Sequence, residues 1–309
     1  MKKIIYLFLI LLLVLSSCGH NDIKESENFD ESIFKEIQGG ENNQLVDYKF
    51  TFGAKDIDNP IKIVVDNLEF ELYINNAGKS AEFGVALCID GYPQLATINE
   101  NKSKIHIVQM QEKEKKSVKI LINKKDLKLE KGNEHYIYPF FVLEPNFKPN
   151  SVNEIRHQGK ISFNIPIKFN YEAEITEDVE IQSAKKMDST FKNKFHINQE
   201  DISVKILSEE LNKTFVKTSE LNNKKINLSV VGNDYGKYKL FLVINNEVVK
   251  INDKDFYKFE LARGMESSIE VDFDKTFHEN DQLYFLLLPV DKESDSSEVY
   301  KTSTIYVRE

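Results

Sequence analysis

Tryptophan is absent from this sequence, and cysteine is nearly so, because only Cys18 and Cys88 occur among the 309 residues. The sequence has no C-x-x-C pair, and its six histidines form no H-E-x-x-H or similar spacing of metal ligands. It also lacks the G-x-S-x-G, Walker and G-x-G-x-x-G motifs. We therefore expect a protein that holds no cofactor and catalyses no reaction.

Positive charge is also in deficit. The chain has 41 lysines and arginines against 50 aspartates and glutamates, which gives a formal net charge of −9 at pH 7. Such an acidic surface repels the phosphates of nucleic acids, so we expect no nucleic-acid partner. It equally argues against binding to anionic lipid through a basic patch. Apolar residues make up 41% of the chain, and its length predicts about two domains.

Residues 1–17 have the three parts of a secretory signal. Lys2 and Lys3 give a positive start, and the unbroken apolar run Ile4–Leu15 follows. This run is shorter than the roughly 20 residues that cross a hydrocarbon core, which argues against an uncleaved transmembrane anchor. Small residues then lead directly to Cys18.

The sequence Leu15-Ser16-Ser17-Cys18 resembles the lipobox of bacterial lipoproteins. The resemblance implies that the chain is cut before Cys18 and that the Cys18 thiol carries a diacylglycerol. Two acyl chains hold a protein on a bilayer where one chain binds only marginally. The implied location is the outer face of the cytoplasmic membrane, and the frequent Lys, Asn and Ile residues indicate a Gram-positive host. The alternative is an ordinary signal peptide with a chance cysteine.

Residues 18–44 are polar and acidic, which predicts a flexible tether. As a random coil the tether would span about 28 Å and keep the folded part close to the membrane. Four apolar residues recur at helical spacing before Gly39-Gly40, namely Phe29, Ile33, Phe34 and Ile37. They fit either a transient helix in the linker or a short amphipathic turn that touches the bilayer or a partner.

Beyond residue 44, polar residues alternate with apolar or aromatic ones, as in 46–52, 68–74 and 160–169. A period of two over short runs, interrupted by Asn, Gly, Asp and Pro, is typical of half-buried strands. Many such runs at short spacing indicate an all-β sandwich. We therefore expect an all-β fold made of immunoglobulin-like antiparallel β-sandwiches.

The chain also repeats itself weakly. Four segments match in order: 83–94 with 238–249, 105–110 with 256–261, 117–120 with 268–271, and 133–143 with 280–290. Strand alternation alone inflates such matches, but four in register favour duplication of one module. We expect two tandem sandwiches, at 45–173 and 174–309, with a boundary that residues 172–183 leave open.

Asp90-Gly91 between two apolar runs predicts a type I′ hairpin turn, which needs a positive φ at both positions. Asn245-Asn246 takes the same place in the second module. A two-residue turn pairs Cys88 with Pro93. Because Pro93 has no N–H to donate, we expect it to lie on an edge strand, 93–98.

Few residues are candidates for chemistry. The apolar neighbours of Cys88 predict a buried structural thiol rather than a reactive one. His106 alternates with two isoleucines, which predicts that it faces solvent; the other histidines are His20, His135, His157, His196 and His278. Tyr136, Tyr138 and Phe140 alternate on one strand, and we expect them in the core, although an outward-facing series would stack on sugar rings.

The best candidate for an acidic cluster is 270–282, whose Asp272, Asp274, Glu279 and Asp281 could gather around a calcium ion. Their spacing is not that of a calcium-binding loop, and acids at strand ends are commonly just solvated. The sequence leaves calcium open there, and we assign no metal site.

Together these features predict a membrane-anchored surface lipoprotein that binds or scaffolds a protein or glycan partner through strand edges and end loops. One alternative is an accessory or solute-binding component of a transporter, although the alternating helices of a two-lobed α/β protein are missing. The other is a hydrolase on a β scaffold that uses the acids of 270–282. The sequence leaves the oligomeric state open.

Overall fold

The structure is a computed structural model that describes residues 43–45, 48–54, 60–151, 154, 160–162, 167–173, 179–197, 204–222, 224–232, 235–273, 275–290 and 299–309. The predicted signal peptide, Cys18 and nearly all of the predicted tether lie outside these residues. Strands dominate, and the helical elements described are short: η1 (Lys124–Asp126), α3 (Ser189–Lys194) and α4 (Thr218–Leu221). None of these helices is long and apolar enough to cross a membrane.

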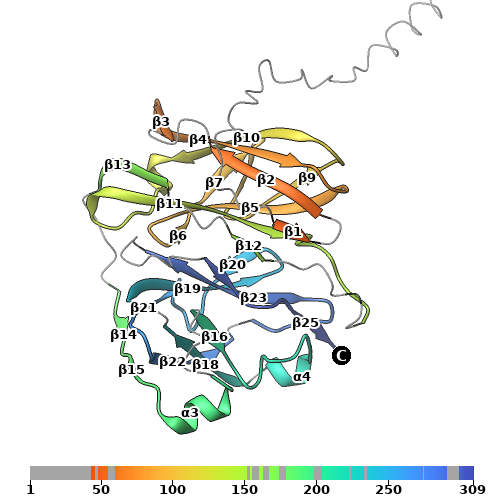
Figure 1. The fold of residues 1–309 in the computed structure, drawn as a ribbon, viewed down its shortest axis with the longest axis vertical. Coiled ribbons are helices and arrows are strands. Elements are labelled where there is room, and N and C mark those ends of the chain that lie inside the picture. The colour runs from red at the N-terminus through yellow and green to blue at the C-terminus, as the bar shows by residue number, and fades with distance from the viewer. Residues whose placement is uncertain are drawn as a thin grey trace, which may run out of the picture.

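The described residues up to 173, which we call the first half, form two antiparallel sheets (Figure 1). One sheet has the order β1 (Asn43–Leu45), β2 (Tyr48–Ala54), β4 (Asn67–Asn76), β10 (Lys115–Asn123), β7 (Ala96–Ile98) and β8 (Asn101–Ser103), with β3 (Ile61–Val64) also on β4. The other has the order β12 (Lys160–Ser162), β11 (Gly132–Leu143), β5 (Ala81–Ile89) and β6 (Tyr92–Pro93), with β13 (Ile167–Ala173) on β11 and β9 (His106–Met110) on β5.

The described residues from 179 onward, the second half, form two further sheets. The larger has the order β14 (Ile181–Gln182), β21 (Tyr257–Leu261), β19 (Gly236–Ile244), β23 (Gln282–Pro289), β25 (Ile305–Arg308) and β17 (Phe215–Lys217), with β20 (Glu247–Val249) on β19 and β24 (Tyr300–Lys301) on β23. The smaller has the order β15 (Lys185–Lys186), β22 (Met265–Asp272), β18 (Lys225–Val231) and β16 (Lys205–Leu207). Only the β14–β21 and β17–β25 pairs are parallel among the described ladders.

The strand pairings of the first half recur in the second. β4 pairs with β10 as β18 pairs with β22. β5 pairs with β6, β9 and β11 as β19 pairs with β20, β21 and β23. This division of strands between two facing sheets is the immunoglobulin-like arrangement. The predicted all-β, immunoglobulin-like sandwich fold is confirmed, while separate modules divided near residue 173 stay a prediction.

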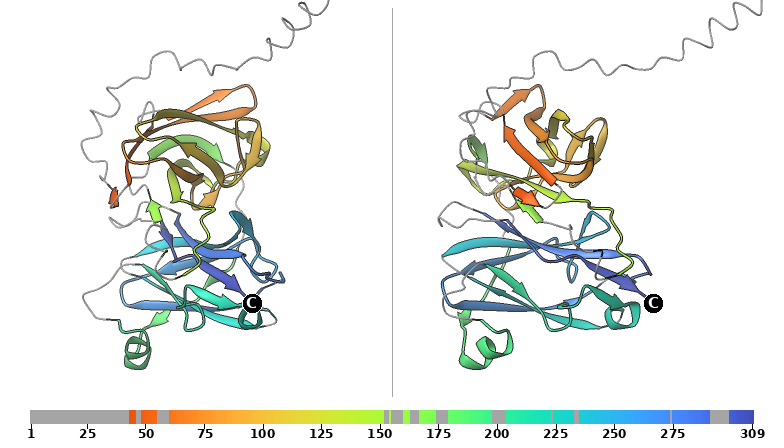
Figure 2. Two further views of the ribbon diagram at one scale, coloured as in Figure 1. Left: turned by 90° about the vertical axis from the view of Figure 1, so that its right-hand side faces the viewer. Right: turned by 45° about the vertical axis from the view of Figure 1, so that its right-hand side comes forward.

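Each half has a core between its own two sheets, and a third apolar cluster joins the halves. In the third cluster, the outward faces of β5 and β11 contribute Ala86, Cys88, Tyr138, Phe140 and Val142, and those of β19 and β23 contribute Phe241, Val243, Tyr284, Leu286 and Leu288. Figure 2 shows the two halves stacked along one axis. Each large aliphatic or aromatic side chain buried here contributes about 1.5–3 kcal/mol relative to exposure.

The predicted hairpin turns are confirmed. Asp90 and Gly91 have φ of 51° and 73°, and Asn245 and Asn246 have φ of 50° and 65°. Cys88 pairs with Pro93, and β6 lies at the edge of its sheet. The predicted continuous edge strand 93–98 is wrong, because the chain leaves this sheet after Pro93 and β7 joins the facing sheet beside β10.

Candidate functional site

Cys88 is fully buried, as its apolar neighbours predicted. Its side chain lies on the outward face of β5, and that face is covered by the second half rather than by the core of its own sandwich. Burial disfavours the thiolate and raises the pKa of Cys88 well above its ordinary value. A thiol with this pKa is a poor nucleophile at neutral pH.

The prediction that His106 faces solvent is wrong. On β9 the buried residues are His106, Val108 and Met110, and Ile107 is 40% exposed instead. The imidazole is accommodated because its Nε2 lies 2.9 Å from the carbonyl oxygen of Ser103 and 3.2 Å from that of Ala96. Burial lowers the pKa of His106, and these two carbonyl contacts oppose the effect only in part.

His135 and Asp90 form a buried pair next to the first hairpin turn. Nδ1 of His135 lies 2.6 Å from Oδ2 of Asp90, and its Nε2 lies 2.7 Å from the carbonyl oxygen of Tyr171. Burial lowers the pKa of His135, but the Asp90 carboxylate and the backbone of Tyr171 and Gly132 together outweigh burial, and the net shift of the pKa is upward. Both ring nitrogens face acceptors, which suits the imidazolium. His196 and His278 are exposed, whereas His20 and His157 lie outside the described residues.

The predicted core position of Tyr138 and Phe140 is confirmed, since both are at most 1% exposed. They face the second half, and Tyr136 packs against the same cluster while half-buried. A sugar ring therefore has no access to Tyr138 or Phe140.

The acids of 270–282 do not converge in the described part of the chain. Glu270 pairs with Lys225 at 2.6 Å on the sheet surface. Asp281 accepts from the backbone N–H of His278 at 2.9 Å and from Nδ2 of Asn245 at 2.7 Å. Asp272 and Glu279 are exposed, and Asp274 lies outside the described residues. No group of three or more potential ligands is placed to hold a metal ion among the residues that are described.

A fully buried charged side chain lies at the junction of the two halves, and sequence reasoning missed it. Lys239 on β19 is fully buried, and its Nζ lies 2.6 Å from Oε1 of Glu130. The same Nζ donates to the carbonyl oxygen of Asp90 at 3.0 Å and lies 2.9 Å from the centroid of the Tyr92 ring. A lysine of the second half is thus enclosed by the hairpin turn of the first.

Burial and the neighbouring charges shift the pKa values of this pair. Burial lowers the pKa of Lys239 from 10.5 to about 7, although Glu130 opposes the shift. Burial raises the pKa of Glu130, but Lys239 and Lys258 outweigh it and leave a net lowering. The pair links β19 of the second half to the residues that precede β11 of the first half, at a site where the Glu130 side chain is 24% exposed.

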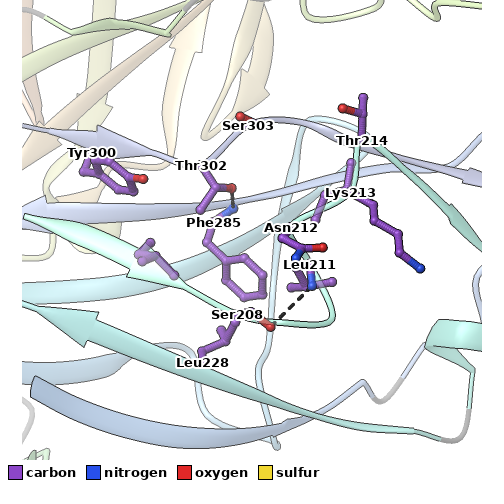
Figure 3. A pocket seen from close by; sticks show the side chains of 12 residues that line it. Ser208, Leu211, Asn212, Lys213, Thr214, Leu228, Phe285, Tyr300, Thr302 and Ser303 are labelled. Carbon is purple, nitrogen blue, oxygen red and sulfur yellow. Dashed lines mark hydrogen bonds between the residues drawn. The ribbon is translucent and has the colours of Figure 1, made fainter. Parts of the chain in front are cut away.

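The best candidate for binding is a pocket of about 190 Å³ in the second half, at an open edge between its two sheets (Figure 3). Apolar side chains from both sheets line it: Ile206, Leu211, Leu228, Phe285 and Ile305. Polar and hydroxyl-bearing side chains complete its lining: Ser208, Asn212, Lys213, Thr214, Tyr300, Thr302 and Ser303.

Two hydrogen bonds join residues that line the pocket. The backbone N–H of Leu211 donates to Oγ of Ser208 at 3.4 Å, which fixes the loop after β16. The backbone N–H of Phe285 donates to Oγ1 of Thr302 at 3.0 Å, because β24 leaves β23 at this point. Figure 3 shows the Phe285 ring between these two segments.

The lining sets apolar strand residues that are at most 8% exposed beside hydroxyl and amide groups. Ligand pockets for small molecules usually have about 300–1,000 Å³, and this pocket is smaller. Its cation, Lys213, pairs with Glu220 at 3.2 Å. The lining is drawn from segments far apart in the chain, so no local motif could have predicted it.

No protein-family model matches the chain, and no curated protein matches it. Its structure is similar to the CupB2 chaperone of Pseudomonas aeruginosa, with 10% identity, a TM-score of 0.21, and coverage of 77% of this chain and 92% of that one. It is also similar to the Escherichia coli chaperone DraB, with 9% identity, a TM-score of 0.24, and coverage of 84% of this chain and 97% of that one. A third similar structure is a Salmonella enterica complex of SafA pilin with the SafB chaperone, with 8% identity, a TM-score of 0.25, and coverage of 84% of this chain and 96% of that one. These identities and TM-scores are too low to carry an inference about what this chain binds.

Proposed function

We propose that this protein is a lipid-anchored surface protein that binds a protein partner without catalysing a reaction. The pocket at the open edge of the second half carries the proposal. It would accept one apolar side chain of an extended partner segment, and its hydroxyl and amide groups would bond the backbone on either side. A protein partner fits this lining better than a glycan, which needs broad polar and aromatic surface.

A photo-crosslinking residue at Asn212, on the exposed loop of the pocket, tests the binding site in the producing cells. We expect one discrete protein adduct. The same residue at Lys113, whose side chain is 79% exposed in the first half, is the control and should give none. Ser303→Trp, which fills the mouth of the pocket, should abolish the adduct, and Ser303→Ala should retain it. Equal adducts at positions 212 and 113, or none at 212, would contradict the site.

The lipid anchor is supported by the resemblance of Leu15-Ser16-Ser17-Cys18 to a lipobox. Cys18→Ala should release the protein from membranes or leave it as uncut precursor, because no thiol remains for the diacylglycerol. Fractionation of cells, with mass spectrometry of the N-terminal peptide, measures this. Mature protein that still carries acyl chains in Cys18→Ala cells would refute the anchor and leave the pocket untouched.

A further inference from the structure

Three aliphatic side chains project into solvent together at the turn between β3 and β4. Ile63, Val64 and Val65 are 58%, 46% and 84% exposed. The register pairs Val64 with Asn67, so Val65 and Asp66 form a two-residue turn. Figure 1 shows β3 on the side of the first half that is turned away from the second half. We call Ile63, Val64 and Val65 the β3–β4 tip.

The backbone of the tip is strained. Val65 has a φ of 54°, in the left-handed region that a β-branched residue rarely adopts. Glycine or asparagine would fill this position at lower cost in folding free energy. An exposed aliphatic cluster on a strained turn contributes nothing to the core, and such features are typical of interaction surfaces.

Lysines surround the tip. Lys62 is exposed on β3 itself. The backbone N–H of Lys124 donates to the carbonyl oxygen of Asp66 at 2.9 Å, which places Lys124 and Lys125 of η1 beside the turn. Asp66 in the turn, Glu69 opposite Lys62 and Asp126 of η1 offset these charges. Two further lysines nearby, Lys119 and Lys102, pair with Glu69 at 2.7 Å and with Asp126 at 2.8 Å. The local balance is positive although the whole chain is acidic, and aliphatic side chains ringed by ammonium groups suit the boundary between lipid headgroups and acyl chains.

We propose that the β3–β4 tip inserts into the surface of a lipid bilayer that contains anionic lipid and orients the first half on it. The aliphatic side chains would enter the acyl boundary, and the lysines would meet lipid phosphates. The tether predicted for 18–44 permits this contact, since each extended residue reaches roughly 3.3 Å. The inference is independent of the pocket in the second half and applies to the chain without its acyl groups.

Vesicle binding of the mature chain with Cys18→Ser, which has no acyl group, tests the proposal. Because the chain has no tryptophan, Val64→Trp supplies a single fluorophore at the tip. Ile181→Trp is the matched control, since Ile181 is 47% exposed on β14 in the second half. With vesicles of phosphatidylcholine and phosphatidylglycerol, we expect the Val64→Trp emission to shift to the blue and to be quenched by brominated acyl chains, while Ile181→Trp emission is unchanged.

A second substitution checks that the aliphatic surface itself drives binding. Ile63→Asp in the Val64→Trp chain should weaken vesicle affinity about tenfold or more, with an unchanged urea midpoint. An unshifted Val64→Trp emission at saturating vesicles would overturn the proposal, as would an equal shift of Ile181→Trp. A blue shift that occurs without vesicles and grows with protein concentration would show that the tip binds a second copy of the chain. That result would also overturn the proposal of membrane insertion.

Discussion

Asp90 shows how much one residue contributes to the junction of the halves. Its carboxylate accepts from the backbone N–H groups of Glu130 and Tyr136, each at 3.0 Å, and from His135. Its carbonyl oxygen accepts from Lys239. The sequence predicted the turn but not this second role, because Lys239 lies 149 residues away in the chain. The one available signal was a lysine flanked by the apolar residues of 238–244.

At pH 5, where Lys239 is protonated, Glu130→Gln should destabilise the protein more than Lys239→Met. Removing the carboxylate leaves the buried ammonium without its ionic partner, which costs about 3 kcal/mol. Methionine instead keeps most of the volume of Lys239, and Glu130 retains Lys258 at 3.3 Å, so this change should be close to neutral. Urea unfolding measures both. A larger loss for Lys239→Met would contradict the role assigned to the pair.

The pH dependence provides a second check on Lys239. The pKa of Lys239 is about 7 in the folded protein, and the ordinary lysine value of 10.5 applies to the unfolded chain. Between pH 7 and pH 10.5 the unfolded chain therefore binds more protons than the folded protein does. The contribution of this group to the free energy of unfolding therefore rises with pH across the window. The stability of the wild type minus that of Lys239→Met should increase from pH 7 toward pH 10. A constant difference would mean that the ammonium is not desolvated.

At the scale of elements, alternation in the sequence predicted where the strands lie better than it predicted which residues of a strand point into the core. In β9, the pairing of Val85 with His106 turns the histidine inward and leaves Ile107 outside. Hydrophobicity alone assigns the opposite phase, because it ignores the two carbonyl oxygens that satisfy the imidazole. The β5 strand was easier to predict, since both of its faces are apolar, and the second half covers the outer one.

Gly91 offers a test of how tightly the hairpin turn packs on the second half. A Cβ at this position would lie 3.1 Å from Cγ2 of Val290, in addition to the strain of a φ of 73°. Gly264 has a similar φ of 77° with nothing within 4 Å, so Gly264→Ala isolates the backbone strain at about 1–2 kcal/mol. Gly91→Ala should cost more than Gly264→Ala in urea unfolding. Equal costs would show that the two halves are not packed closely at this turn.

At the scale of the whole molecule, the repeat in the sequence anticipated the recurrence of strand pairings, but nothing in it indicated how the halves meet. The outward faces of the central strands are apolar in both halves, and they cover each other. Polar contacts add to this surface, such as Nδ2 of Asn246 to Oδ1 of Asn146 at 3.0 Å. A strand that is apolar on both faces is predicted to be covered on both sides. In this protein the second cover is the other half, so the same sequence pattern specifies the junction between the halves.

Separated fragments 45–173 and 174–309 should each fold, because each contains a complete core between two sheets and about 130 residues suffice for an independent domain. Each would then expose its face of the shared cluster, so the two fragments should associate one to one when mixed. Phe241→Asp in the second fragment should prevent association without unfolding it, because association would bury a carboxylate within the shared apolar cluster. Circular dichroism and sedimentation measure the two steps. Failure of both fragments to fold, beside a single transition for the intact chain, would refute two modules, whereas folded fragments that ignore each other would refute the junction.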